Sequence, residues 1–408
     1  MINVFQLHII YYSYRTGIDR YIEMLTDGIN NRQNRDVVSH TICFTNDIEK
    51  LFPRITVSSE NVLTAFIPLP KDEKLLFKNS FWKKRYISIV CEILTPYLKN
   101  FSSLCFQYNN LFLSELAEVM KNKFGGKIIA CLHCLPWKFK LNSNIQIFSR
   151  LYRLYHDGQY DIFRRLENST VNYALSDMII CLSSSAKEYI VNIHNIDPEK
   201  IKIIYNGLPD DANGKMRSEK SRPEILYVGK VSRDKGIFEM LGVLKNIRAK
   251  GLDFGVTVAG SVSGIMTDKI KNDCNMQDID FRGEIPFNEL KKLYFSCTFG
   301  VIPSLHEQCS YVAIEMAMSG LPVIVSDVDA LAEIFEHEKT ALLTPLVLDP
   351  ELGIKIKHEQ FEKNIIRLLT DKTLREKLSR NIRKLYENKF THDKMISETV
   401  AVYKQLYN

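Results

Sequence analysis

The stretch ILYVGKVSRDKG, residues 225–236, decides the fold class predicted for this chain. Four apolar residues precede Gly229, and a short polar loop carrying Lys230 and Lys235 leads to a helical pattern that opens near Gly236. A buried strand that enters a helix through such a loop is the repeating unit of a parallel α/β sheet. The unpaired amides of a helix start and two ammonium groups suit a diphosphate, although two lysines alone are more often solvated surface residues.

The same strand and helix alternation extends outward in both directions from this unit, which predicts parallel sheets covered by helices. At 408 residues the chain exceeds the size of a single core, so we expect two domains. The expected strands are Ile2–Ile10, Val37–Phe44, Val62–Ile67, Ser103–Phe106, Lys127–His133 and Asp177–Ser183 in the first half, then Glu224–Gly229, Gly255–Gly260, Ile279–Gly283, Thr298–Pro303 and Pro322–Ser326 in the second.

A cluster of turn formers at Asn206–Gly214 separates the two series and predicts a hinge. We expect an N-terminal, acceptor-side domain at 1–208 and a nucleotide-sugar-binding domain at 209–385. The last segment, 386–408, is expected to form a helix that packs back on the first domain. From residue 351 onward the pattern is almost continuously helical, with breaks expected near Asp371 and Thr391.

Several classes of protein are disfavoured by what the sequence lacks. No two of its 18 glycines have the Gly-x-Gly spacing of a dinucleotide site, and the phosphate-loop motif is absent. A net charge of +6 is too small to indicate a nucleic-acid binder. The start of the chain reads as a buried strand with no leader, and no apolar run could span a bilayer. We therefore expect a protein with reduced cysteines in the cytoplasm or at the inner face of the membrane.

A second loop that enters a helix contains two glutamates, Glu307 and Glu315. Eight helical residues rise about 12 Å, so the two carboxylates could not reach one ligand atom if both were helical. If Ser310 caps the helix, Glu307 lies in the loop, and the pair could hold separated hydroxyls of one long ligand. Amides around Cys309 to Val312 would point at its middle. Taken alone, a Glu pair is more often part of a solvated, capped helix.

These motifs together resemble family 4 of the retaining glycosyltransferases, which have the GT-B fold. The resemblance runs from Ile225 to Pro345 and includes Gly283, the Glu-x7-Glu pair, the Gly-x-Pro turn at Gly320 and Glu333. It implies an α/β protein with two Rossmann-like domains that face each other across a cleft. It also implies transfer of a hexose from a UDP or GDP sugar with retention of configuration, and neither a metal nor a cofactor.

The resemblance implies a role for each matching residue. Lys230 and Lys235 would hold the donor diphosphate, Glu315 the ribose hydroxyls, and Glu307 the hydroxyls of the transferred sugar. Gly17, in the loop after the first strand, would let its backbone approach the phosphates, and His133 would line the sugar site. The expected catalytic residues are His133, Glu307 and Lys235, and the expected donor-binding residues are Gly17, Lys230, Lys235, Glu307, Cys309, Ser310, Tyr311 and Glu315.

The chain departs from the family pattern at a few positions. Lys230 stands where arginine is usual, which replaces a planar fork by a point charge. Ser310 stands where glycine is usual, and Val328-Asp329-Ala330 replaces paired glycines. These changes affect the identity of the donor sugar more than the class of reaction. They also leave open a catalytically silent sugar-nucleotide or glycan-binding partner of another transferase, or a related GT-B epimerase or phosphorylase.

Three further patterns have competing interpretations. The Asp-x-Asp pairs at Asp278 and Asp327 match a metal motif of a different fold, and we interpret them as loop and surface residues. Cys131 and Cys134 lack the second pair that a zinc site needs. The basic and aromatic segment from Lys71 to Arg85 could contact an anionic membrane, but we favour a solvated helix whose aromatics pack inward. The acceptor stays open between a glycan, a lipid-linked sugar and a peptide.

Overall fold

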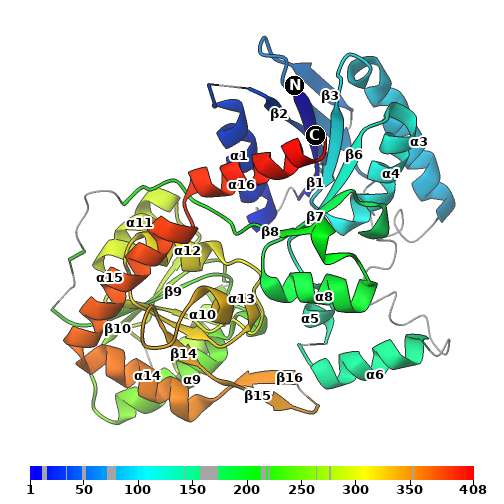
Figure 1. The fold of residues 1–408 in the computed structure, drawn as a ribbon. Helices are drawn as coiled ribbons and strands as arrows, with labels where there is room; N and C mark the ends of the chain where they lie inside the picture. The colour runs from blue at the N-terminus through cyan, green and yellow to red at the C-terminus, as the bar shows by residue number, and fades with distance from the viewer. Residues whose placement is uncertain are drawn as a thin grey trace. The chain divides into compact units, whose positions relative to one another are not determined.

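A computed structural model of the chain forms two compact units, each of which is described by itself (Figure 1). The described residues are 1–11, 16–33, 35–47, 52–70, 80–141, 143–156, 173–212, 217–218, 221–262, 264–274, 277–351 and 353–408. The first unit comprises Met1–Leu135, Asp161–Asn206 and His392–Asn408, and the second comprises Pro136–Tyr160 and Gly207–Thr391.

The first unit is built on an eight-stranded sheet in the order β3-β4-β2-β1-β5-β6-β7-β8. All neighbouring pairs are parallel except the edge pair of β3 and β4. The central strand is buried almost throughout because helices cover both faces of such a sheet. The strands are β1 (Ile2–Ile10), β2 (Val37–Thr45), β3 (Arg54–Val57), β4 (Leu63–Pro68), β5 (Leu104–Tyr108), β6 (Lys127–Leu132), β7 (Met178–Cys181) and β8 (Ile201–Ile203).

The helices of the first unit include one from the far end of the chain. Helix α16 lies beside α1 and contacts β1, so the last helix belongs to the first unit (Figure 1). Its Tyr403 is fully buried there. The helices are α1 (Gly17–Asn30), α3 (Ser80–Leu98), α4 (Ser114–Phe124), α8 (Ser184–His194) and α16 (His392–Gln405), with short 3-10 turns at Leu111–Leu113, Tyr173–Leu175 and Pro198–Lys200.

The second unit contains a six-stranded parallel sheet in the order β11-β10-β9-β12-β13-β14 and a separate antiparallel hairpin, β15 and β16. Its core joins strand residues such as Val256 and Phe299 to apolar faces of α9 and α14. The strands are β9 (Glu224–Val228), β10 (Gly255–Ala259), β11 (Asp280–Gly283), β12 (Phe299–Ile302), β13 (Val323–Ser326), β14 (Leu342–Thr344), β15 (Leu346–Asp349) and β16 (Gly353–Ile356).

Two helices from the first half of the sequence, α5 and α6, belong to the second unit. Trp137 on α5 stacks on Phe148 on α6 with ring centroids 4.3 Å apart, and the Asn144 amide donates to the Pro350 carbonyl at 3.0 Å. The helices of this unit are α5 (Pro136–Lys140), α6 (Ile145–His156), α9 (Ile237–Ala249), α10 (Gly264–Cys274), α11 (Phe287–Ser296), α12 (Tyr311–Met318), α13 (Asp329–Ile334), α14 (His358–Thr370) and α15 (Lys372–Lys389), with a 3-10 turn at Arg233–Lys235.

All eleven predicted strands are present within one or two residues of their predicted ends. The sequence pattern missed β3, β8, β14 and the hairpin, which consist of strands of three or four residues. The prediction of helix from residue 351 was wrong for β16, whereas helix breaks near Asp371 and Thr391 are confirmed. The predicted first domain, 1–208, also differs from the first unit, since Pro136–Tyr160 groups with the second.

Candidate functional site

The second sheet reverses its strand order between β9 and β12. From β9 the chain adds β10 and β11 on one side, and from β12 it adds β13 and β14 on the other. Loops that leave two adjacent strands toward opposite sides expose the strand ends between them, where open parallel sheets bind ligands. The two loops are 229–236 and 303–310, which are the segments that the sequence motifs single out.

These two loops pack against each other through their backbones. The Leu305 amide donates to the Asp234 carbonyl at 2.9 Å. Gly236 has φ +65°, and a Cβ atom built there would lie 1.9 Å from the Pro303 carbonyl oxygen. Only glycine fits such an approach, because any side chain would both clash with the backbone and strain it. Gly236 therefore fixes the distance between the loop of Lys235 and the loop of Glu307.

Lys235 and Glu307 form an ion pair at this edge of the sheet. The Lys235 Nζ lies 2.7 Å from Glu307 Oε1, and the two side chains are 31% and 13% exposed. Burial by itself would lower the pKa of Lys235, but the charge and hydrogen bond of Glu307 outweigh it and raise that pKa. The ammonium group is therefore charged at every pH at which the protein would work.

His306 lies beside this pair and is neutral at physiological pH. Its side chain is only 4% exposed, and its Nε2 is 4.0 Å from Asp234 Oδ2. Burial lowers the pKa of His306 to about 4, and the nearby charge of Lys235 lowers it further in the same direction. The sequence motifs did not single out this residue, since a buried histidine gives no pattern of its own.

Ser310 is the N-cap residue of α12, and its Oγ accepts from the Ala313 amide. Glu307 therefore lies in the loop before the helix, while Glu315 lies within it. Glu315 is 2% exposed, and its Oε2 accepts a 2.6 Å hydrogen bond from the Tyr294 hydroxyl on α11. A ribose hydroxyl at Glu315 would share this carboxylate with Tyr294.

The remaining predicted residues of the second unit differ in exposure. Lys230 is exposed, and its ammonium group makes no ion pair with the described residues. Its carbonyl accepts from the Tyr227 hydroxyl at 2.8 Å, which fixes the backbone of the loop. Cys309 is buried and Tyr311 is half-buried at the first turn of α12. The structure thus brings together Lys235 and Glu307, and leaves Lys230 at the surface.

A second ion pair at the same edge joins Lys138 on α5 to Asp329 at the start of α13. Lys138 is 8% exposed and Asp329 is 29% exposed. Burial lowers the pKa of Lys138 to about 8, and the charge of Lys138 makes a small contribution to the low pKa of His306. The interpretation of Asp329 as a plain loop residue missed this pair, because Lys138 is distant in sequence.

The described residues contain no group of three or more His, Cys, Asp or Glu side chains that could hold a metal ion. Asp278 instead accepts hydrogen bonds from Arg222 and Arg248. No described helix is both long and apolar enough to cross a membrane.

The first sheet reverses its strand order between β1 and β5. After β1, Thr16 caps α1 in a capping box: the Thr16 amide donates to Asp19 Oδ2 at 2.6 Å, and Thr16 Oγ1 accepts from the Asp19 amide at 3.2 Å. Gly17 is the exposed first residue of this helix. The preceding Tyr12–Arg15 lie outside the described residues.

His133 follows β6 in the first unit and is held by uncharged neighbours. Its Nε2 lies 3.2 Å from Asn109 Oδ1, and the Tyr21 ring meets it edge-on with centroids 4.8 Å apart. Burial lowers the pKa of His133 to about 3, and His8 lowers it further in the same direction. His133 is therefore a neutral imidazole at physiological pH.

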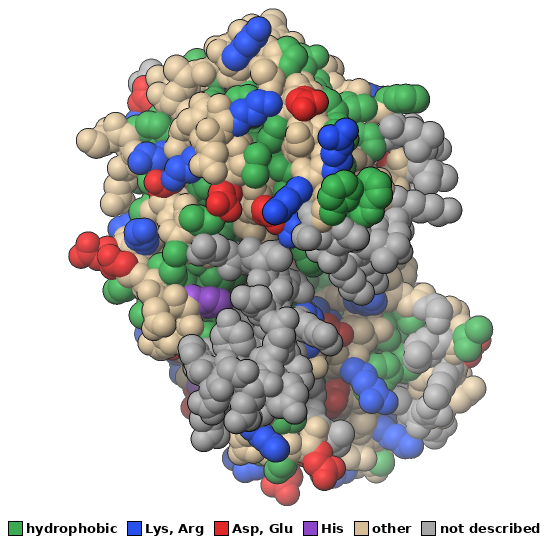
Figure 2. Space-filling view, turned by 90° about the vertical axis from the view of Figure 1, so that its right-hand side faces the viewer, with side chains coloured by type: hydrophobic (Ala, Val, Ile, Leu, Met, Phe, Trp, Pro, Cys, Tyr) green, Lys and Arg blue, Asp and Glu red, His purple; other side chains and the backbone are tan. Residues whose placement is uncertain are grey.

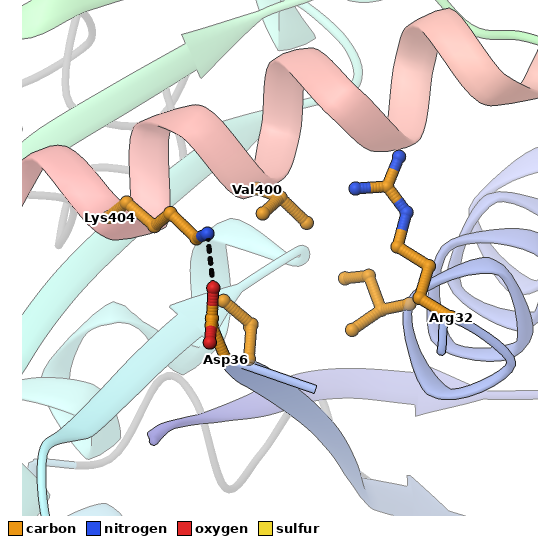
Figure 3. Close-up of a pocket in the computed structure, with 6 residues that line it drawn as sticks. Arg32, Asp36, Val400 and Lys404 are labelled. Atoms are coloured by element: carbon orange, nitrogen blue, oxygen red, sulfur yellow. Dashed lines mark hydrogen bonds and ion pairs between the residues drawn. The ribbon is translucent and has the colours of Figure 1, made fainter. Parts of the chain in front are cut away.

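A pocket of about 300 Å³ lies at the opposite edge of the first sheet (Figure 3). It is lined by the end of α1, the start of β2 and α16, and the Lys404 ammonium donates across it to Asp36 at 2.5 Å. Arg32 also lines it and donates to Ser397 Oγ at 2.7 Å. Because ligands of parallel sheets bind at the carboxyl edge, this pocket at the amino edge is not part of the candidate site.

Two family models match the chain: Glycosyltransferase Family 4 over residues 36–212 and Glycosyl transferases group 1 over residues 210–385. Over its full length the fold is similar to sucrose-phosphate synthase from Thermosynechococcus elongatus, with a TM-score of 0.75, 18% identity, and coverage of 100% of this chain and 99% of that one. The chain has the GT-B fold, and its two halves match models of two glycosyltransferase domains. The predicted GT-B fold is therefore confirmed.

Another solved GT-B structure, HepE of Anabaena in complex with UDP-glucose, has a TM-score of 0.67 and 11% identity over 98% of this chain and 99% of that one. Among curated relatives, an uncharacterised glycosyltransferase of Methanocaldococcus jannaschii is 31% identical over 56% of this GT-B chain and 60% of its own length. The O-antigen chain mannosyltransferase of Salmonella typhimurium is 28% identical over 53% of this chain and 60% of its own. The chain thus matches less than two thirds of these relatives' lengths.

Proposed function

We propose that this GT-B chain transfers a sugar from a nucleotide-diphosphate sugar of the UDP or GDP type to a glycan, lipid-linked or peptide acceptor. The observation that carries the proposal is the Lys235–Glu307 ion pair at the strand reversal of the second sheet. It places a cation that suits a diphosphate beside a carboxylate that suits sugar hydroxyls. The binding of UDP-glucose by HepE supports a nucleotide sugar as donor, and the O-antigen relative supports a glycan acceptor.

The transfer proposed here needs no metal ion. Cleavage of the bond between the sugar C1 and the phosphate oxygen leaves negative charge on the diphosphate. The ammonium group of Lys235 is charged and fixed before reaction, and Lys230 is exposed and can turn toward the same group. Two such cations and the amides at the start of α12 would neutralise the leaving group.

The configuration at the sugar C1 is proposed to be retained. The acceptor oxygen forms its bond to C1 on the face from which the diphosphate leaves, and the acceptor proton passes to the departing phosphate oxygen. Glu307 would orient the sugar hydroxyls and does not serve as the nucleophile. The neutral His133 would donate or accept a hydrogen bond at the sugar, since its low pKa excludes a role as a cation.

The first test is donor turnover in EDTA with a panel of UDP and GDP sugars. We expect slow release of one nucleoside diphosphate, and a loss of about 100-fold or more in Lys235→Ala, because a preorganised cation acts on the transition state. Lys384→Ala, an exposed lysine on α15, is the matched control and should retain full activity. Nucleoside diphosphate is measured by a coupled assay or by chromatography.

Four outcomes would change the proposal. Release that appears only after manganese is added contradicts the metal-free mechanism. No release, with no donor raising the thermal unfolding temperature, favours a catalytically silent partner of another transferase. Conversion of the donor to a different sugar nucleotide without an acceptor identifies an epimerase. Turnover that requires inorganic phosphate identifies a phosphorylase.

We also propose that α3 contacts an anionic membrane surface. The expectation that its aromatics pack inward was wrong for Phe81 and Trp82, which are 67% and 60% exposed, and Ile89 is 44% exposed. Lys84 and Arg85 are exposed beside them, whereas Lys83 is buried and pairs with Glu115. Figure 2 views the side of the first unit that carries α3, where hydrophobic side chains lie next to Lys and Arg. Residues 71–79 lie outside the described part.

Exposed aromatic rings beside cations suit an interfacial helix, since the rings enter the headgroup layer while the cations pair with anionic lipids. The test is sedimentation with vesicles of phosphatidylglycerol or of phosphatidylcholine. We expect binding to the anionic vesicles alone, and loss of binding in a Phe81→Ser, Trp82→Ser double variant. Ile265→Ser removes an 87% exposed apolar residue of the second unit and should bind like the wild type. Equal binding by both variants contradicts the proposal.

A further inference from the structure

Four uncharged side chains close a hydrogen-bonded ring inside the first unit. The Tyr403 hydroxyl donates to Gln107 Oε1 at 2.7 Å, and Gln107 Nε2 donates to Asn109 Oδ1 at 3.2 Å. Asn109 Nδ2 donates to Gln6 Oε1, and Gln6 Nε2 donates back to the Tyr403 oxygen, both at 3.1 Å. All four residues are at most 3% exposed.

The hydrogen bonds of the ring all run in one direction, and the ring contacts His133 through Asn109. Each member donates to one neighbour and accepts from the other, and in this arrangement the Asn109 oxygen faces Gln107 and His133. A carbonyl oxygen can only accept, and His133 Nε2 lies 3.2 Å from it. With the Asn109 amide in this orientation, His133 carries its proton on Nε2, and Nδ1 is left as the acceptor.

We propose that Tyr403, on the last helix of the chain, is a positioning residue that fixes the tautomer and orientation of His133 through Gln6, Gln107 and Asn109. The inference deepens the proposed function, on which the role of His133 rests. Tyr403 is the only member of the ring that is not an amide. Its hydroxyl closes the ring, because it donates its single proton to Gln107 and accepts from Gln6.

Burial makes this arrangement persistent. An amide that lost its partner at these positions would keep an unsatisfied polar group away from water, which costs free energy. The groups that face His133 from other elements are Tyr21 on α1 and His8 on β1, with Asp19 Oδ1 3.8 Å from His8 Nε2. The pKa values of Tyr403 and Tyr21 are raised by burial, so neither phenol becomes an anion.

The direct measurement is the ¹⁵N spectrum of the histidine side chains in the wild-type protein, which needs no turnover. The chain has nine histidines, and His133→Gln assigns the signal that disappears. We expect the shifts and couplings of a neutral His133 with its proton on Nε2. A proton on Nδ1 would mean that the ring runs in the opposite direction, and it would overturn the proposal.

Tyr403→Phe removes only the hydroxyl, so the three amides can turn and His133 should become a mixture of tautomers. Tyr407→Phe is the matched control, because its hydroxyl is in the same C-terminal segment and donates to the Leu104 carbonyl, outside the ring. We expect Tyr403→Phe to lower kcat for donor turnover about tenfold with KM nearly unchanged, and Tyr407→Phe to change neither.

A double variant separates positioning from simple destabilisation. If Tyr403 acts through His133, Tyr403→Phe should change kcat by less than about twofold in a His133→Gln background. An undiminished effect there, or an unchanged His133 spectrum in Tyr403→Phe, would overturn the proposal. If the wild-type protein turned over no donor, the proposed function would fail while the spectra still decided the tautomer.

Discussion

The two sheets carry their candidate residues at equivalent places but hold them by different means. At the strand reversal of the second sheet, Lys235 and Glu307 are held by charge, and Lys138 and Asp329 form a second pair beside them. In the first unit, His133 is held by a ring of neutral amides and one phenol. The site of the second unit is thus held by charges, whereas the geometry around His133 in the first unit needs none.

This difference teaches how each site would respond to change. Ion pairs are insensitive to small shifts in position but depend on both charges being present. A directed ring of hydrogen bonds is insensitive to salt but depends on every donor having one acceptor. Removal of a charge should therefore disturb the second unit most. Acid should disturb the first unit most, because its buried histidines are neutral.

The largest expected effect is that of Asp329→Asn, which leaves the Lys138 ammonium without its carboxylate partner at 8% exposure. We expect it to lower the free energy of unfolding by about 2 kcal/mol, between the values for exposed and fully buried pairs. Lys138→Met should cost less, because the Asp329 carboxylate is 29% exposed and can be hydrated. Urea unfolding followed by the fluorescence of Trp137, in a Trp82→Phe background, measures both.

The control for this pair is Glu336→Gln, which breaks the exposed ion pair with Lys339 and should cost less than about 0.5 kcal/mol. If Asp329→Asn cost no more than this control, the second unit would not depend on its charges in the way that the comparison requires.

Acid should destabilise the first unit more than the second. In the first unit, burial lowers the pKa of His40 to about 3, of His8 to about 4 and of His133 to about 3. In the described part of the second unit, the histidine whose pKa is lowered in this way is His306. Between the ordinary pKa of 6.5 and these values, the unfolded chain binds protons that the folded protein does not. Stability therefore falls as pH falls, by about 1.4 kcal/mol per pH unit for each such histidine.

His40 offers the cleanest test of this effect. Its Nδ1 accepts from the Leu63 amide at 2.9 Å and its Nε2 meets Asn3 Oδ1 at 3.1 Å, so a second proton would remove an acceptor. His40→Gln should flatten the loss of stability between about pH 6 and pH 4, measured by thermal unfolding and hydrogen exchange. His337→Gln, with a 46% exposed side chain, should not. If stability fell equally steeply with pH in the wild type, His40→Gln and His337→Gln, buried histidines would not explain the acid sensitivity of the first unit.

The smallest effect is expected at Gly17, the first residue of α1. Its backbone has no positive φ, so alanine can adopt the same conformation and should raise the free energy of unfolding by about 0.5 kcal/mol. If the donor approaches this backbone, the same variant should lose turnover while it gains stability. A stabilised Gly17→Ala protein with full turnover would remove Gly17 from the donor site.

Much of the fold could be predicted from the sequence because parallel α/β units are locally encoded. Each strand is a short apolar run, and caps such as Thr16 and Ser310 act within three residues of themselves. The family resemblance implied that Lys235 and Glu307 bind one donor, and the structure brings their segments together because both follow adjacent strands. The aromatics of α3 were misjudged, because a helical period does not reveal which face meets other elements.

The sequence by itself determined the alternation of strands and helices, the caps and the order of the site motifs, since these depend on residues a few positions apart. The tertiary structure alone decided which side chains meet across long separations: Lys138 with Asp329, and Tyr403 with Gln6, 397 positions away. Such contacts depend on how complete sheets and helices pack. The sequence around a single lysine, tyrosine or glutamine contains no local pattern from which its partner could be predicted.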